Sequence, residues 1–180
     1  WKQGKQKEIS NPLNHRWIYW WGSEGSGRTH LLQAMMNAAE LTGLKSFSLT
    51  PTEPISWVRL EEQIEALAES EQASVITVDD VDHLNERLVG ALFRILNWVQ
   101  ASKNIHIFMA GNAAPANLEL REDLRTRLGW GLIFQTQLLG DDEKIQALEQ
   151  AARDRGLMLS PEVVPWLLNR FYRCLLYTSD

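Results

Sequence analysis

The stretch that decides the fold reads Gly22-Ser23-Glu24-Gly25-Ser26-Gly27-Arg28-Thr29. It fits the pattern G-x-x-x-x-G-[K/R]-[S/T], in which backbone N–H groups turn inward and hold phosphate oxygens. Glycine permits positive φ and close approach of a phosphate, and a helix that begins near Thr29 adds the positive end of its dipole. We therefore predict that the phosphates of a nucleotide are bound by Gly22, Gly25, Ser26, Gly27, Arg28 and Thr29.

The segments on either side of this loop have the character that the pattern requires. Residues 18–21 are apolar and end at Gly22, which is typical of a buried strand. Residues 29–41 place their apolar side chains on one broad face, which predicts a helix. The alternative is a Gly- and Ser-rich turn without a ligand, which would need neither a strand before it nor a helix after it.

Arg28 stands where most loops of this pattern have Lys. The positive charge is kept, so we expect phosphate binding to survive. The forked, planar guanidinium is longer than the compact ammonium of Lys and places its charge differently. We therefore expect a site that holds a nucleotide better than it cleaves one. Thr29 can offer its hydroxyl to Mg²⁺, which takes few protein ligands in such sites.

Two acids follow the clearest strand of the chain. Residues 75–78 are Val-Ile-Thr-Val, and Asp79 and Asp80 come next, at the end of a strand where ligands of α/β proteins bind. We expect Asp79 to hold Mg²⁺ with Thr29. Asp80 is a weak candidate for activating water, because it is one methylene shorter than the Glu of many ATPases. A solvated acidic loop is the alternative, since Asp82 continues the run.

The order of expected elements predicts one α/β domain followed by helices. Strands are expected at 18–21, 47–49, 75–78, 105–110 and 132–134, and helices at 29–41, 57–67, 84–99 and 118–128. Pro51 and Pro54 are expected to break the chain between the second strand and its helix. Helices alone follow, at 141–155 and from Ser160-Pro161 onward. The alternation predicts a parallel sheet with a helical appendage.

Composition narrows the class of protein further. The chain has 180 residues, 44% of them apolar, enough to bury a core. The net charge of −5 argues against a broad nucleic-acid surface. No apolar run is long enough for a membrane helix, and no signal peptide is visible. The single cysteine, Cys174, fits a reducing compartment, so we expect a cytoplasmic protein.

We expect four segments along the chain. Residues 1–16 are an N-terminal remnant of a longer protein, since the chain begins at Trp1, and residues 17–138 are the α/β domain. Residues 139–173 are a partial helical lid. Residues 174–180 break the pattern of the preceding helix, and we expect them to be foreign to the native chain.

Residues 121–134 carry a family resemblance. They read Arg-Glu-Asp-Leu-Arg-Thr-Arg-Leu-Gly-Trp-Gly-Leu-Ile-Phe, which resembles the segment of DnaA-type AAA+ proteins that holds the arginine finger. By that match Arg127 is the finger, and Asn112, after the strand 105–110, is the sensor 1 residue that contacts the nucleotide. A turn residue is the alternative for Asn112. Arg121 and Arg125 are more readily explained as surface partners of Glu119, Glu122 or Asp123.

The resemblance extends from Trp17 to Arg173, with the motifs in the family's order. It implies an AAA+ P-loop NTPase with a five-stranded parallel sheet flanked by helices and a small helical lid, truncated here. Arg28 and the lack of a helix-turn-helix segment favour the Hda-like regulators within the family. The clamp-binding peptide of those proteins is not found in residues 1–12, and their sensor 2 Arg is not found after Arg173.

The resemblance also implies a function. Hda-like proteins bind ADP or ATP with Mg²⁺ and stimulate ATP hydrolysis by DnaA through an arginine finger in trans, which is the role expected for Arg127. The implied partners are DnaA, a DNA-loaded sliding clamp and further copies of the chain. A membrane and direct sequence-specific DNA binding are not implied.

Three other functions remain open from the sequence. An active AAA+ ATPase, such as a DnaA paralogue or a helicase loader, would show its own hydrolysis. A small-molecule P-loop kinase would leave residues 127–131 without a role. A non-catalytic adaptor would bind nucleotide only for its structure.

Overall fold

The computed structural model describes residues 16–158, 160, 162, 163 and 166. The described residues fall into two compact units. The first unit is an α/β domain made of residues 16–22 and 28–135. The second unit combines residues 23–27 of the phosphate-binding stretch with the described residues from 136 onward.

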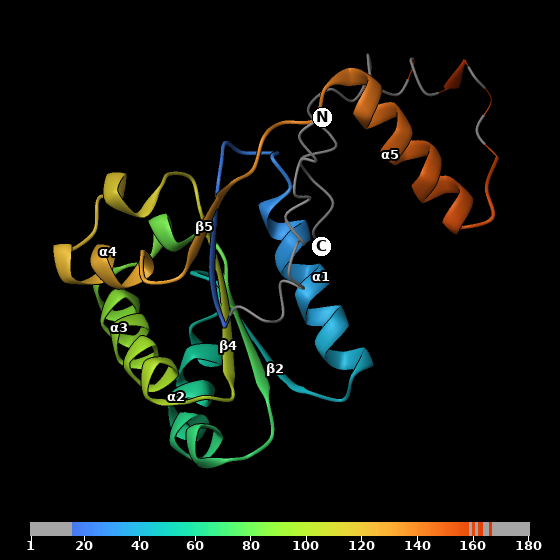
Figure 1. The fold of residues 1–180 in the computed structure, drawn as a ribbon. Helices are drawn as coiled ribbons and strands as arrows, with labels where there is room; N and C mark the ends of the chain where they lie inside the picture. Colours follow the sequence, from blue (N-terminus) through green and yellow to red (C-terminus); the bar gives the residue numbers. More distant parts are fainter. Residues whose placement is uncertain (1–15, 159, 161, 164–165, 167–180) are drawn as a thin grey trace, which may run out of the picture. The chain divides into compact units, whose positions relative to one another are not determined.

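A parallel sheet forms the centre of the first unit, as the sequence predicts (Figure 1). Its five strands run in the order β2-β3-β4-β1-β5, and every neighbouring pair is parallel. The buried strands are apolar and β-branched or aromatic, as suits a sheet covered on both faces. The strands are β1 (Trp17–Trp21), β2 (Lys45–Leu49), β3 (Ser74–Val78), β4 (Ile105–Gly111) and β5 (Leu132–Gln135).

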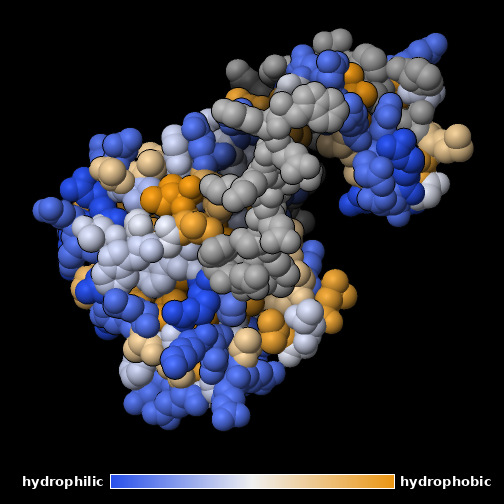
Figure 2. All heavy atoms as spheres, in the orientation of Figure 1, coloured by the Kyte–Doolittle hydropathy of each residue, from blue (hydrophilic) through white to orange (hydrophobic). Residues whose placement is uncertain are grey.

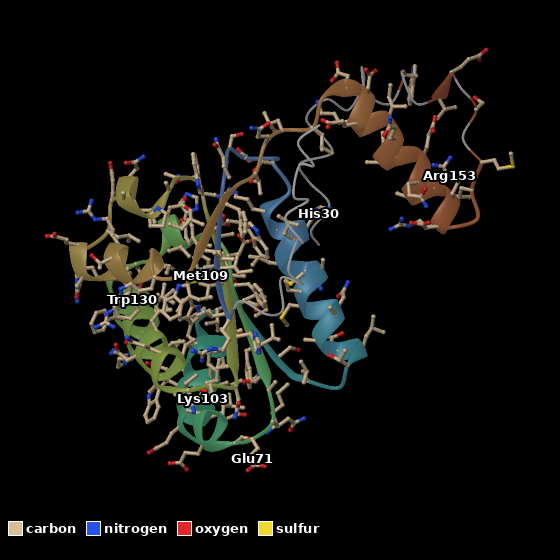
Figure 3. The ribbon with its side chains drawn as sticks, viewed as in Figure 1. His30, Glu71, Lys103, Met109, Trp130 and Arg153 are labelled. Atoms are coloured by element: carbon tan, nitrogen blue, oxygen red, sulfur yellow. The ribbon has the colours of Figure 1, made fainter. Side chains whose placement is uncertain are left out.

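Helices cover both faces of this sheet (Figure 1). One face packs against α1 through a core that includes Leu32, Trp20 and Phe108. The other face packs against α2, α3 and α4, where Met109 lies in the interior (Figure 3). Alternate strand residues therefore serve the two cores, as the period of a strand requires. The helices are α1 (Arg28–Leu41), α2 (Pro54–Glu69), α3 (Glu86–Ala101) and α4 (Glu122–Leu128).

The strand register brings the candidate residues to one edge. Trp21 pairs with Gly111 and Val78 pairs with Met109, so β1, β3 and β4 end together. The backbone N–H of Gly22 donates to the carbonyl of Gly111 at 3.3 Å. Gly22, Asp79 and Asn112 therefore leave the sheet at the same carboxyl edge.

Three predicted helix starts are wrong, each for a local reason. Pro54 begins α2 instead of breaking the chain, because proline suits the first turn of a helix. The third helix starts at Glu86, not at residue 84, because Asn85 caps it and accepts the N–H of Leu88 at 3.0 Å. The helix expected from residue 118 begins at Glu122, after a 3₁₀ turn at Pro115–Asn117.

The second unit contains the helix α5 (Asp141–Asp154). Its first turn carries Asp141, Asp142 and Glu143, which complement the helix dipole. The N–H of Gly140 donates to Oε2 of Glu143 at 2.7 Å. The predicted helix that opens at Ser160-Pro161 falls mostly outside the described residues.

The face of the molecule in Figure 2 is largely hydrophilic, with small hydrophobic patches between charged side chains. Within the described part of the chain, the helices are too short or too polar to cross a membrane.

Candidate nucleotide-binding site

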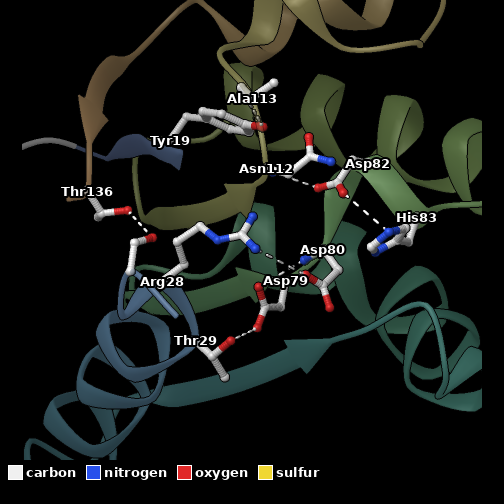
Figure 4. A network of polar contacts seen from close by, with 11 residues as sticks. Tyr19, Arg28, Thr29, Asp79, Asp80, Asp82, His83, Asn112, Ala113 and Thr136 are labelled. Atoms are coloured by element: carbon white, nitrogen blue, oxygen red, sulfur yellow. Dashed lines mark hydrogen bonds and ion pairs between the residues drawn. The ribbon is translucent and has the colours of Figure 1, made fainter. Parts of the chain in front are cut away.

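The phosphate-binding stretch has the backbone that its glycines predict. Gly25 and Gly27 have φ values of 79° and 85°, in the left-handed region that glycine adopts without strain. The N–H of Ser26 donates to the carbonyl of Ser23 at 3.1 Å, which closes a turn. The Ser26 hydroxyl lies 2.7 Å from that of Thr136 (Figure 4). Thr136 is a contact of the loop that no sequence motif indicates.

Arg28 lies in the first turn of α1 with only 11% of its side chain exposed. Its Nη2 lies 4.0 Å from Oδ1 of Asp80 (Figure 4). Its Nη1 is buried and has no hydrogen-bond partner among the described residues. A buried N–H donor without an acceptor is costly, and a phosphate oxygen would satisfy it. The surroundings of Arg28 therefore fit the phosphates of a nucleotide.

Thr29 and Asp79 are brought together, as the sequence predicts for a Mg²⁺ pair. Oγ1 of Thr29 donates to Oδ2 of Asp79 at 2.7 Å (Figure 4). The other carboxylate oxygen accepts the backbone N–H of Asp80 at 2.9 Å. The described residues hold no group of three or more His, Cys, Asp or Glu that could bind a metal alone. A hydroxyl and one carboxylate fit Mg²⁺ held mainly by nucleotide phosphates and water.

Asp80 has an unusual backbone and an unusual environment. Its φ of 47° makes it the one non-glycine residue with positive φ in the described chain. Asp tolerates this left-handed region better than most residues, and strained positions of this kind gather at functional sites. Burial raises the pKa of its carboxyl, and the charge of Asp79 raises it further, while Arg28 opposes both. Its role in activating water stays a prediction.

The alternative of a solvated acidic loop does not hold for Asp82. Its side chain is only 8% exposed, because it turns towards the end of β4. Oδ1 accepts the backbone N–H of Asn112 at 2.8 Å, and Oδ2 lies 3.5 Å from Nε2 of His83 (Figure 4). Asp82 thus fixes the backbone of the candidate sensor residue. The one sequence signal for it is its place in the acidic run after β3.

A second contact holds the same segment from β1. The buried hydroxyl of Tyr19 donates to the carbonyl of Ala113 at 3.0 Å (Figure 4). Burial raises the pKa of this phenol, and the charge of Asp82 adds to the effect. A Cβ on Gly111 would lie 2.1 Å from the Tyr19 hydroxyl oxygen, so a side chain there would displace it. The backbone is therefore held at the N–H of Asn112 and at the carbonyl of the next residue, Ala113.

Arg127, in the last turn of α4, belongs to a different cluster. Its Cζ lies 4.1 Å from the ring centroid of Phe93 and 4.8 Å from that of Trp130. None of the ion pairs formed by the described residues includes Arg127. It is half-buried and stands apart from the network of Arg28, Thr29 and Asp79.

The two neighbouring arginines have other partners. Arg121 pairs with Asp123, which confirms its predicted surface role. Arg125 donates from Nη1 to the carbonyl of Ala116 at 3.1 Å, so the prediction of an acidic partner is wrong for this residue. The nearby backbone carbonyl is exposed by the 3₁₀ turn that the sequence did not predict.

The glycines beside Trp130 have separate structural roles. Gly129 ends α4, and its N–H donates to the carbonyl of Arg125 at 3.2 Å. A Cβ on Gly131 would lie 2.0 Å from the carbonyl oxygen of Trp17, so only glycine allows the chain to pass β1 this closely. Trp130 in turn lies 5.8 Å from the ring of Trp17, centroid to centroid. Residues 127–131 thus fasten the end of α4 to the sheet.

A parallel sheet with a phosphate-binding loop, acids after β3 and a helical unit after β5 defines a P-loop domain of the AAA+ type. Residues 5–135 match the family model of the bacterial DnaA ATPase domain, and residues 141–177 match that of the Hda lid domain. The chain therefore belongs to the DnaA-related AAA+ family, with a lid of the Hda type.

The chain is also similar to individual proteins. An uncharacterised protein of Haemophilus influenzae is 31% identical over 170 residues, which cover 93% of this chain and 71% of that protein. Among solved structures, AMPPCP-bound DnaA from Aquifex aeolicus has a TM-score of 0.64 at 23% identity, over 86% of this chain and 50% of that one. Domain III of Thermotoga maritima DnaA has a TM-score of 0.67 at 19% identity, over 87% and 69%.

These structural likenesses establish the fold. The RuvB protein of Thermotoga maritima shares it more distantly, with a TM-score of 0.57 at 17% identity, over 83% of this chain and 47% of that one. The chain spans about half the length of the Aquifex DnaA chain that it matches.

Proposed function

We propose that this protein binds an adenine nucleotide with Mg²⁺ and restrains replication initiation by stimulating ATP hydrolysis on DnaA. The proposal rests on the surroundings of Arg127. It is a half-buried cation on a DnaA-type domain, without a carboxylate partner among the described residues. An unneutralised guanidinium outside the domain's own phosphate-binding network is suited to another protein's nucleotide.

The chemistry asked of Arg127 is electrostatic. Water attacks the γ-phosphate of the ATP held by DnaA, and ADP and phosphate leave. Negative charge spreads over the phosphoryl oxygens in the transition state, where a guanidinium stabilises it. Arginine fingers accelerate such reactions roughly 10³- to 10⁵-fold. This contribution requires only that Arg127 reach the neighbouring nucleotide.

The protein's own nucleotide has a structural role in the proposal. Thr29 and Asp79 would hold Mg²⁺, and the unpartnered Nη1 of Arg28 would bind a phosphate oxygen. Asn112 would contact the nucleotide from the end of β4. Arg28 in place of Lys and the short Asp80 favour a retained ADP over turnover. A DNA-loaded sliding clamp and further copies of the chain are the proposed partners, in the cytoplasm.

The test compares Arg127→Ala with Arg94→Ala in the full-length regulator. Arg94 is an exposed arginine that pairs with Glu61, so it controls for loss of a surface charge. Hydrolysis of labelled ATP prebound to DnaA is followed with clamp-loaded DNA present. We expect Arg127→Ala to remove the stimulation and Arg94→Ala to retain it, with ADP binding unchanged in both. Full stimulation by Arg127→Ala would overturn the proposal.

A second candidate is an AAA+ ATPase with its own turnover, because the Thr29–Asp79 pair is complete. Steady-state hydrolysis by the protein alone, abolished in Asp80→Asn, would favour this function. Under the regulator proposal we expect little intrinsic hydrolysis and no dependence of stimulation on Asp80.

A further inference from the structure

We propose that Phe93 and Trp130 are positioning residues that hold the guanidinium of Arg127 in place while leaving it charged. The inference rests on the proposed function of Arg127 and adds the residues that make it effective. Phe93 comes from α3, and Trp130 follows the end of α4. The three residues belong to the same compact unit.

The cluster differs from the other arginine contacts of the domain. Arg94 pairs with Glu61 and Arg121 with Asp123, so carboxylates neutralise both cations, and Cζ of Arg121 also lies 5.7 Å from the ring centroid of Phe93. Arg127 has the two aromatic rings instead, at 4.1 and 4.8 Å from Cζ. An aromatic face attracts a guanidinium through its quadrupole and carries no net charge to cancel. The aromatic contacts therefore place Arg127 and preserve its charge.

The two rings are themselves held in position. Phe93 packs against the main core beneath α3. Trp130 lies against Trp17 of β1, and it follows Gly129 at the end of α4. Gly131, the residue after Trp130, lies against the Trp17 backbone. Trp130 thus fixes Arg127 relative to the sheet, and Phe93 fixes it relative to α3.

Arg127 remains accessible to a partner. With Trp130, Glu122, Asp123 and Thr126 it lines an open hollow of about 610 Å³. Trp130 is 45% exposed, and its place at the α4 end of the domain is seen in Figure 3. In this proposal a phosphoryl group presented by another chain approaches the guanidinium from this hollow, past Glu122 and past Asp123, whose charge is offset by Arg121.

An Arg127 side chain held by the two rings and one free to rotate should differ mainly in the maximal rate of ATP hydrolysis that they stimulate on DnaA. A long Arg side chain has many rotamers, and fixing one of them costs conformational entropy. If the rings fix it beforehand, that cost is not met in the transition state. Loss of either ring should therefore lower the maximal rate of stimulated hydrolysis more than the affinity for DnaA.

The experiment uses the full-length regulator with Phe93→Leu and Trp130→Leu, and the conservative variants Phe93→Tyr and Trp130→Phe. Trp98→Leu is the matched control, because it removes a partly buried aromatic ring of α3 that is not one of the two rings in contact with Arg127. Hydrolysis of ATP on DnaA is measured at saturating regulator. We expect a loss of about tenfold or more for each Leu variant and less than about threefold for the aromatic variants and Trp98→Leu.

Two further measurements separate this inference from the proposed function. The ring-current shift of the Arg127 Nε–H resonance reports the aromatic contacts without DnaA, and it should move towards the random-coil value in the Leu variants. In the Arg127→Ala background the Leu changes should have no further effect on rate. Folded Leu variants with unchanged rate and unchanged Nε–H shift would overturn the inference. Full stimulation by Arg127→Ala alone would overturn the proposed function instead.

Discussion

At some positions the packing of this domain allows only one residue type, and Gly131 is the clearest case. A methyl group there would meet the Trp17 carbonyl oxygen at 2.0 Å, and the obstacle is backbone. We expect Gly131→Ala to lower the free energy of unfolding by at least about 2 kcal/mol, through overpacking. Urea denaturation measures the change.

Gly90 provides the control for this substitution. It lies inside α3, where a Cβ would meet only Nη1 of Arg94, at 3.5 Å. Alanine is the better helix former by about 1 kcal/mol, so Gly90→Ala should leave the protein equally stable or more stable. Similar effects of the two substitutions would contradict the close approach at Gly131.

The shifted pKa of Asp80 predicts a pH-dependent stability change. Its pKa is raised from the ordinary 3.8, mainly by burial, so folding disfavours the carboxylate. The protonated group contributes stability that is lost as the pH rises through the folded-state pKa. Asp80→Asn should therefore be more stable than the parent at neutral pH, and the gain should fade as the pH falls towards 3.8.

Thermal unfolding between pH 3.5 and pH 8 tests this prediction, in roughly the range where carboxyl groups titrate. Asn also tolerates the left-handed backbone at this position, whereas Ala does not. Asp80→Ala should therefore lose part of the gain. A gain for Asp80→Asn that grows as the pH falls would show that the sign is wrong.

The residues that the sequence could predict are those whose chemistry fixes their type. Phosphate and Mg²⁺ binding need the loop, a hydroxyl and an acid in a known order, so Thr29 and Asp79 could be paired before their contact was seen. Asp82 could not be, because its acceptor role depends on where β4 ends, 30 residues later. Phe93 gives no signal at all, since an aromatic residue on an amphipathic helix is ordinary.

At the scale of elements, the end of β4 is held by contacts from two other segments. Asp82 accepts the N–H of Asn112, and Tyr19 of β1 donates to Ala113. We expect Asp82→Ala to increase amide exchange at Asn112 about tenfold or more, since a hydrogen bond to a charged group contributes about 1.5–3 kcal/mol. Hydrogen exchange followed by NMR gives the rate for this one amide.

Controls on the same element make this prediction specific. Asp82→Asn keeps an oxygen acceptor and should have a smaller effect. His83→Ala removes the exposed neighbour of Asp82, with 69% of its side chain in solvent, and should leave the Asn112 amide protected. Unchanged exchange in Asp82→Ala would mean that Tyr19 alone holds the segment.

Elements were predictable where one pattern dominates. All five strands were predicted, because apolar runs bounded by Gly, Pro and acids leave few alternatives. Helix starts were less predictable. The helix starts are decided by capping and by proline geometry, which hydrophobic periodicity does not reveal. The residues concerned are Asn85, Pro54 and the turn at Pro115–Asn117.

At the scale of the whole molecule, the order of the strands in the sheet could not be predicted from the sequence pattern. Alternating strands and helices predict a parallel sheet, and many orders satisfy that alternation. The observed order β2-β3-β4-β1-β5 places β1 between β4 and β5. This arrangement puts the segment after β1 beside the end of β4, which is why Gly22 reaches Gly111 and Tyr19 reaches Ala113.

The last prediction concerns the stability of the whole chain with its nucleotide. A ligand that binds only the folded protein at about 100 times its Kd adds about 2.7 kcal/mol to the free energy of unfolding. For a domain of this size that corresponds to a rise in Tm of roughly 5–10 °C. We expect this rise with Mg²⁺–ADP, measured by differential scanning calorimetry, and a much smaller one in Arg28→Ala at the same concentration.

Lys45→Ala is the control, because Lys45 is an exposed cation at the start of β2, where it pairs with Ser74 at the amino end of β3. It therefore lies at the edge of the sheet opposite Asp79 and should keep the full shift. A buried guanidinium N–H with no acceptor makes Arg28→Ala less damaging to the nucleotide-free protein than to the complex. Equal Tm shifts in the parent and Arg28→Ala would show that Arg28 does not bind the phosphates.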